Sequence, residues 1–111
     1  MKKLIILFCT LLLIVGCGPK VSKEIKSYCK SYLSVVDKVI AGEKDQMDAY
    51  WDLKEFYDKI NDIRETDDEF TVIVYLMSVD SLLMSWTLAS DNPIEELKTR
   101  RNKLAGSCGV K

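Results

Sequence analysis

The sequence contains no histidine among its 111 residues, which removes the most common general base and the most common transition-metal ligand together. Its four cysteines form no CxxC motif, so the pattern of a thiol redox or zinc site is missing. The five glycines form no phosphate-binding loop. These absences predict a protein that is not an enzyme and holds no cofactor or metal. A polar cleft with paired carboxylates would reopen the enzymatic alternative.

Excess positive charge is also missing, and the charge that is present is unevenly placed. Without the first sixteen residues, fourteen basic and seventeen acidic residues leave a net charge of −3, so we expect no nucleic-acid partner. Residues 20–38 carry +3, residues 43–69 carry −7 and residues 94–111 carry +3. The middle of the chain is therefore acidic and both ends are basic.

The chain opens with the three parts of an export signal. Lys2 and Lys3 precede an apolar run over residues 4–15, and the small residue Gly16 follows. Twelve apolar residues are too few for a stable transmembrane anchor, which needs about 20. The sequence therefore predicts a signal peptide over residues 1–16.

The end of this signal, Ile14-Val15-Gly16-Cys17, resembles the lipobox of bacterial lipoproteins. The resemblance implies that Cys17 receives a diacylglyceryl group on its thiol, with cleavage after Gly16 and acylation, for example by palmitate, of the new amine. Such chains hold a protein on a membrane. Gly18 stands where lipoproteins retained in the inner membrane often carry Asp, so the resemblance favours the outer membrane. An ordinary secretory signal is the alternative.

Export leaves two further cysteines, Cys29 and Cys108, in an oxidising compartment. We expect them to form one disulfide, and two free buried thiols are the alternative.

Two stretches carry apolar residues at the three- and four-residue spacing of a helix face. The first runs from Val21 to a stop at Gly42, and Asp45 can cap the second. Their stripes are Val21, Ile25, Cys29, Tyr32, Val36 and Val39, then Ala49, Leu53, Phe56, Ile60 and Ile63.

A third helix is predicted from Asp67 to about Ser90, because Thr66 and Glu69 form a capping-box pattern. Apolar residues occur on every side of it, which indicates a helix enclosed by its neighbours. A strand over residues 70–76 and a membrane span over residues 71–89 are alternatives. The missing partner strand disfavours the first, and Asp80 disfavours the second.

Asn92 and Pro93 predict the start of a fourth helix that Gly106 ends. Four helices with short connections predict an all-α, antiparallel up-down bundle over residues 21–111, preceded by a lipidated tether over residues 17–20. In this arrangement Cys108, in a tail after Gly106, can reach Cys29.

Three side chains on the second helix form a candidate partner-binding site. Met47 and Trp51 fall opposite its core stripe and Tyr50 flanks that stripe, so exposed Met and Trp could anchor a partner. The alternative is that they close the end of the bundle. We expect Asp80 to pair with a neighbouring Lys or Arg. A small face on the third helix favours helix packing: Ser78, Ser81, Ser85 and Ala89.

These expectations favour a lipid-anchored protein of the bacterial envelope that docks or assists another envelope protein without catalysis. The alternative is a phage- or plasmid-type exclusion lipoprotein, which blocks a surface receptor or entry route. In both, the membrane is bound through Cys17, and the basic stretches 20–30 and 98–103 would face anionic headgroups. Localisation is predicted at the periplasmic face or the surface of the outer membrane.

Overall fold

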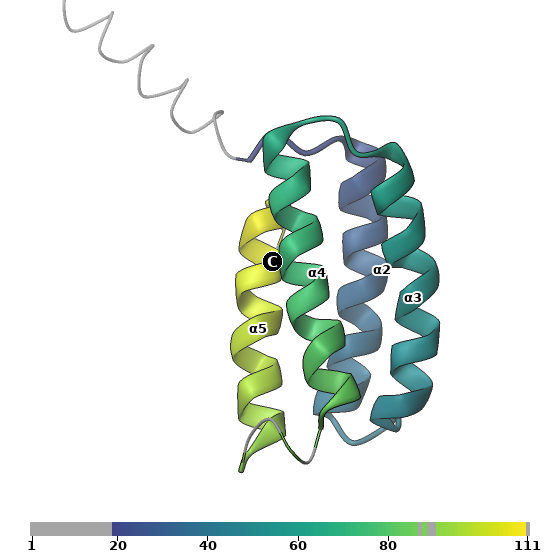
Figure 1. The fold of residues 1–111 in the computed structure, drawn as a ribbon, viewed down its shortest axis with the longest axis vertical. Coiled ribbons are helices and arrows are strands. Elements are labelled where there is room, and N and C mark those ends of the chain that lie inside the picture. The colour runs from purple at the N-terminus through teal and green to yellow at the C-terminus, as the bar shows by residue number, and fades with distance from the viewer. Residues whose placement is uncertain (1–18, 87, 89–90, 111) are drawn as a thin grey trace, which may run out of the picture.

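A computed structural model describes residues 19–86, 88 and 91–110; the predicted signal peptide, Cys17 and Ala89 lie outside them. Four helices form one bundle: α2 (Lys23–Ile40), α3 (Gln46–Ile63), α4 (Asp67–Met84) and α5 (Pro93–Cys108) (Figure 1). The predicted all-α bundle is confirmed. The alternative of a strand over residues 70–76 is wrong, because these residues lie within α4.

Three of the four helix starts follow the capping residues that the sequence predicted, whereas α2 begins at Lys23, after Ser22, rather than at Val21. The side chains of Ser22, Asp45, Thr66 and Asn92 each accept a hydrogen bond from a backbone N–H of the following first turn. Thr66 and Glu69 complete the capping box that the sequence predicted. The four starts are therefore fixed by local side chains.

Two helix ends differ from the prediction. α4 ends at Met84 rather than near Ser90, because Ser85 leaves the helical conformation and its hydroxyl donates to the Ser81 carbonyl oxygen at 2.8 Å. α5 continues through Gly106 to Cys108 and ends at Gly109, whose φ is 74°. The Gly109 N–H donates to the Gly106 carbonyl oxygen, which closes the last turn.

α2 and α4 lie diagonally across the bundle, and each packs against α3 and α5. Successive helices run in opposite directions along the long axis of the bundle (Figure 1). Contacts between distant residues agree with this course, since Cys29 joins Cys108 whereas Asp37, farther along α2, joins Arg101, earlier on α5. The core lies between the helices and contains fully buried Tyr32, together with leucines and valines from all sides.

The predicted disulfide between Cys29 and Cys108 is confirmed, with the two Cα atoms 6.6 Å apart. Cys108 is the last residue of α5, and so the expectation that it lies in a tail after Gly106 is wrong. Both cysteines are fully buried. The bond closes 79 residues of chain and joins the first half of α2 to the end of α5.

The first described residues are attached to the start of α4. The Lys20 N–H donates to Asp68 Oδ2 at 2.7 Å, and the Thr66 hydroxyl donates to the Lys20 carbonyl oxygen at 2.8 Å. The Ser22 N–H donates to Glu69 Oε2 at 2.8 Å. We name this set of bonds the entry clamp.

The buried carboxylate of Glu69 is the centre of the entry clamp, with 3% of the residue exposed. Burial alone would raise its pKa, but the backbone N–H groups of Glu65, Ser22 and Thr66 outweigh that effect and hold the pKa below its usual value. The charged form of Glu69 is therefore the form that the fold favours.

Among the described residues, no helix is long and apolar enough to cross a membrane.

Candidate functional site

A row of exposed side chains follows the outer side of α4. Phe70, Val74, Met77 and Met84 are 50%, 48%, 53% and 58% exposed, and Ser81 lies between the two methionines. The spacing is four, three, four and three residues, which is the spacing of helix seams that bind a second helix. We name Phe70, Val74, Met77, Ser81 and Met84 the α4 row. Leu88, 90% exposed, lies just beyond its end.

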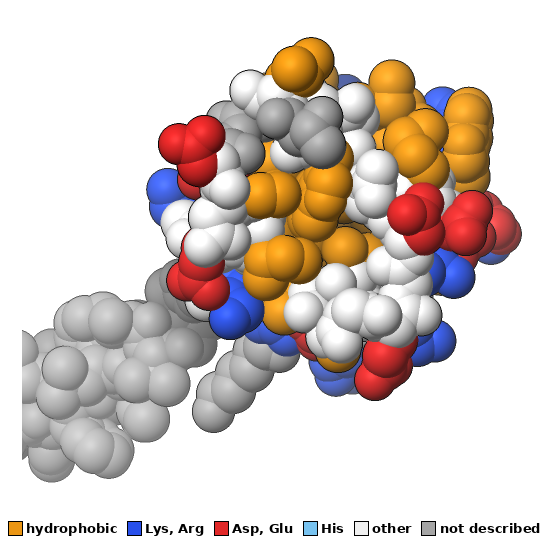
Figure 2. Space-filling model, turned by 90° about the horizontal axis from the view of Figure 1, so that it is seen from below, with side chains coloured by type: hydrophobic (Ala, Val, Ile, Leu, Met, Phe, Trp, Pro, Cys, Tyr) orange, Lys and Arg blue, Asp and Glu red, His pale blue; other side chains and the backbone are white. Residues whose placement is uncertain are grey.

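The α4 row corrects the expectation that α4 is enclosed by its neighbours. α4 packs against α3 and α5, and its remaining side is open to solvent. Its apolar residues occur on every side because one set fills the core while a second set faces outward. Figure 2, which views the bundle from the end away from Lys20, shows hydrophobic side chains gathered at this end.

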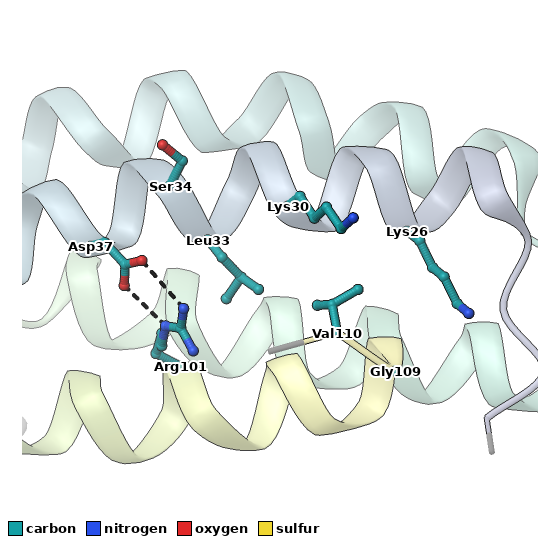
Figure 3. Close-up of a pocket in the computed structure, with 8 residues that line it drawn as sticks. All are labelled: Lys26, Lys30, Leu33, Ser34, Asp37, Arg101, Gly109 and Val110. Carbon is teal, nitrogen blue, oxygen red and sulfur yellow. Dashed lines mark hydrogen bonds and ion pairs between the residues drawn. The ribbon is translucent and has the colours of Figure 1, made fainter. Parts of the chain in front are cut away.

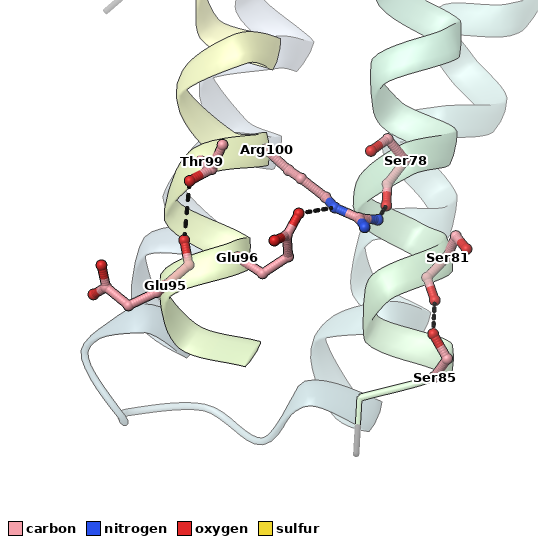
Figure 4. A network of polar contacts seen from close by, with 7 residues as sticks. All are labelled: Ser78, Ser81, Ser85, Glu95, Glu96, Thr99 and Arg100. Atoms are coloured by element: carbon pink, nitrogen blue, oxygen red, sulfur yellow. Dashed lines mark hydrogen bonds and ion pairs between the residues drawn. The ribbon is translucent and has the colours of Figure 1, made fainter. Parts of the chain in front are cut away.

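The predicted small face of α4 has a mixed role. The Ser78 carbonyl oxygen accepts a hydrogen bond from Arg100 Nη1 of α5 at 2.7 Å, and Glu96 holds the same guanidinium at 3.0 Å (Figure 4). Ser81, in contrast, belongs to the exposed row, and Ser85 ends the helix. Among the described residues of this face, Ser78 is the one whose backbone carbonyl oxygen bonds to α5.

A groove of about 310 Å³ runs beside the α4 row, between α3 and α4. Met77, Asp80, Ser81 and Met84 line it from α4, and the facing residues of α3 are Tyr50, Lys54 and Tyr57. We name this depression the α3–α4 groove. It combines aromatic and methionine side chains with a single carboxylate and a single amine, which is the composition of a site that binds an apolar segment with a defined polar contact.

Asp80 gives the α3–α4 groove its charge. Tyr32 of α2 donates its hydroxyl to Asp80 Oδ1 at 2.6 Å, and it also contacts the Leu76 carbonyl oxygen at 3.2 Å. The expected ion pair with a Lys or Arg is therefore replaced by a bond to a neutral phenol. The second oxygen of Asp80, Oδ2, accepts no hydrogen bond from a described residue. It is not fully buried, because every fully buried side-chain oxygen among the described residues has a hydrogen-bond partner. Oδ2 is therefore accessible from the groove.

Burial raises the pKa of Asp80 to about 6. The hydrogen bond from Tyr32 and the positive charge of Lys54 oppose this rise, and the negative charge of Asp58 adds to it. The same contact and burial raise the pKa of Tyr32 well above its usual value, with burial as the larger cause. The surroundings of Asp80 thus stabilise its negatively charged form only in part.

The predicted anchor residues lie beside this groove. Trp51 is 62% exposed and Met47 is 39% exposed, so they do not close the end of the bundle. The rings of Tyr50 and Trp51 meet edge to face, with centroids 5.2 Å apart, and Tyr50 lines the groove. The Met47, Tyr50 and Trp51 cluster therefore extends the apolar surface from the groove onto the outer side of α3.

Sequence reasoning missed Met77 and Met84, which form the opposite wall of the groove. Their signal was the regular spacing from Phe70 to Met84, which also suits a buried helix. Only the positions of the neighbouring helices distinguish an exposed row from a buried face with the same spacing.

Three of the four basic residues of α5 are paired with carboxylates. Lys98 pairs with Glu95 at 3.1 Å, Arg100 with Glu96, and Arg101 with Asp37 of α2 at 2.9 Å. α5 also begins at the end of the bundle away from Lys20 (Figure 1). The expectation that the stretch 98–103 lies at the tether end is therefore wrong, because these residues occupy the middle of α5.

No protein-family model matches the chain, and searches of the curated proteins and of the solved structures found no similar protein. Among residues 19–86, 88 and 91–110, no group of three or more acidic or cysteine side chains could hold a metal ion.

Proposed function

We propose that the protein is a lipid-anchored component of the bacterial envelope that docks an amphipathic helix of another envelope protein. The exposed α4 row carries this proposal. Helix-binding grooves are read by apolar anchors three, four and seven residues apart, which is the spacing from Phe70 to Met84. A long apolar row on the surface of a small domain is typical of an interaction site.

The charge around the groove favours a basic partner helix. Residues 43–69, which include α3 and the turns that flank it, hold eleven acidic and four basic residues. A cationic side chain on the partner would meet the open oxygen of Asp80 while its apolar face covers the α4 row. A second copy of this chain would instead bring a second acidic surface to the same face, which like-charge repulsion disfavours.

The anchor is the second part of the proposal. The lipobox-like residues Ile14-Val15-Gly16-Cys17 support acylation at Cys17, and Gly18 supports the outer membrane. Metabolic labelling with palmitate tests this directly, because Cys17→Ser should abolish incorporation and release the protein from the membrane fraction. Label that persists in the Cys17→Ser variant would contradict acylation at this residue.

Docking is tested by placing a photo-crosslinking amino acid at Ser81, an exposed position of the α4 row, and at the exposed Thr99 of α5 as the control position. We expect one envelope protein to crosslink from Ser81 and not from Thr99. Met77→Lys should lower that crosslink by at least about tenfold, since docking would bury an added positive charge against a basic helix. Thr99→Lys adds the same charge elsewhere and should have no effect, whereas Trp51→Ala should weaken the crosslink.

The crosslinked peptide identifies the occupant. A basic segment with apolar residues at helical spacing supports the proposal. A crosslink to a second copy of this chain, to an acidic or extended segment, or to no protein at all would overturn it.

A further inference from the structure

A second depression lies between α2 and α5, on a different side of the bundle from the α3–α4 groove. It has a volume of about 630 Å³, and its lining includes Lys26 and Lys30 from α2 and Val110 from the end of the chain. Figure 3 shows the Lys26 and Lys30 side chains extending from α2 above Gly109 and Val110. We name this depression the α2–α5 cleft.

Positive charge in the α2–α5 cleft exceeds what its own carboxylate neutralises. Asp37 accepts two hydrogen bonds from Arg101, at 2.9 Å and 3.2 Å, so these two residues neutralise each other. Lys26 and Lys30 form no hydrogen bond or ion pair with any described residue. The cleft thus presents two ammonium groups, one turn of α2 apart, that have no partner among the described residues. An anion would relieve their mutual repulsion.

The backbone at the end of α5 keeps the space below Lys26 free. Gly109 has a φ of 74°, which only glycine adopts at low cost, and a Cβ atom there would lie 3.6 Å from Lys26 Cε and 3.8 Å from its Nζ. These are ordinary contact distances, so the positive φ, and not a clash with Lys26, favours glycine at this position. Leu33, almost fully buried, and Val110 add an apolar floor.

We propose that the α2–α5 cleft binds the phosphate group of an anionic phosphate ester. The ammonium groups of Lys26 and Lys30 hold the phosphate oxygens, and Leu33 and Val110 contact the organic part of the ester. Ammonium groups bind phosphate as point charges and need no fixed fork geometry. This site does not depend on the docking proposed above, because it shares no residue with the α3–α4 groove.

The position of the cleft favours a phospholipid headgroup as the source of the phosphate. Pro19 Cδ lies 4.0 Å from the Cβ position at Gly109, so the cleft adjoins the chain two residues after Cys17. An anionic headgroup beside the anchored end would be within reach, whereas a soluble ester would arrive from solution. Both sources carry the same phosphate chemistry.

The test uses the full chain, isotopically labelled, in phosphatidylcholine nanodiscs, with amide resonances of Lys26, Lys30 and Val110 as the readout. One arm adds soluble glycerol phosphate, and a second arm replaces part of the phosphatidylcholine with phosphatidylglycerol. Shifts that saturate in the second arm alone identify a lipid headgroup site, and saturation in the first arm identifies a site open to free esters. An absence of saturable shifts in both arms would overturn the proposal.

Two double variants with equal charge separate a site from general attraction. Lys26→Gln with Lys30→Gln should weaken the binding by at least about tenfold, because two charge-assisted hydrogen bonds are lost. Lys98→Gln with Lys103→Gln removes the same charge from α5, outside the cleft, and should leave the midpoint nearly unchanged. Equal weakening in both double variants would show that net charge alone binds the ester, and the cleft would then not be a site.

Discussion

Replacing Asp80 by Asn should stabilise the protein at neutral pH and have little effect in acid. Asn keeps the shape of the side chain and can still accept the hydrogen bond that Tyr32 donates at 2.6 Å. The substitution removes only the negative charge, which burial makes unfavourable in the folded protein. The effect must therefore follow the ionisation of Asp80.

The sign and size of the effect come from the two pKa values. The usual value for Asp is 3.8 and the folded value is about 6, so the folded state holds its proton over a range where the unfolded chain has lost it. Stability therefore falls as pH rises from about 4 to about 6, and the full loss persists above that range. A difference of about two pKa units corresponds to about 3 kcal/mol.

Urea unfolding at a series of pH values measures this difference, with Asp62→Asn as the control, since Asp62 is an exposed carboxylate on α3. We expect Asp80→Asn to exceed the wild type by about 1 to 3 kcal/mol above pH ~7 and to match it near pH ~4. A gain that does not change with pH, or a loss of stability above pH ~7, would refute the reasoning.

Three further changes test the fold. Cys29→Ser should lower the free energy of unfolding by about 4 kcal/mol, because it opens a loop of 79 residues, and a reducing agent should destabilise the wild type but not the variant. Glu69→Gln should destabilise by about 1 to 3 kcal/mol near neutral pH; because the pKa of Glu69 is lowered by folding, the difference should shrink as pH falls through the carboxylate range. Gly109→Ala should cost about 1 kcal/mol in thermal unfolding because its φ is 74°, whereas Gly106→Ala, in open space within α5, should gain up to about 1 kcal/mol; equal effects would contradict the assigned end of α5.

The sequence predicted the features that depend on neighbouring residues. Asp45, Thr66 and Asn92 bond the backbone within their own first turn, so short-range chemistry is enough to locate three of the four helix starts. The start of α2 was predicted at Val21, and the structure places it at Lys23. The disulfide was predictable because only two cysteines, Cys29 and Cys108, follow Cys17 in the sequence. Gly106 and Gly109 both suit a helix end, and only the backbone conformation distinguishes them.

Features that depend on distant segments were not predictable in this way. Asp80 accepts a hydrogen bond from Tyr32, which lies 48 residues earlier in the sequence. The charge of Asp80 predicts a cationic partner, and only the fold shows that a neutral phenol takes that place. Met77 and Met84 have the same spacing as core residues, and their exposure follows from the absence of a neighbouring helix on that side of α4. The α3–α4 groove depends on the packing of α3 against α4, which the sequence pattern does not specify.

If Cys17 is acylated, as proposed, the entry clamp limits the distance between the bundle and the bilayer. With acyl chains on Cys17, only Gly18 and Pro19 separate the lipid from the bonded Lys20, a reach of roughly 10 Å. α4 starts at that end and its 18 residues extend about 27 Å away from it. The groove and Trp51 would thus be held some 30 Å above the bilayer surface, so the protein would select partners by where their basic helix stands as well as by its sequence.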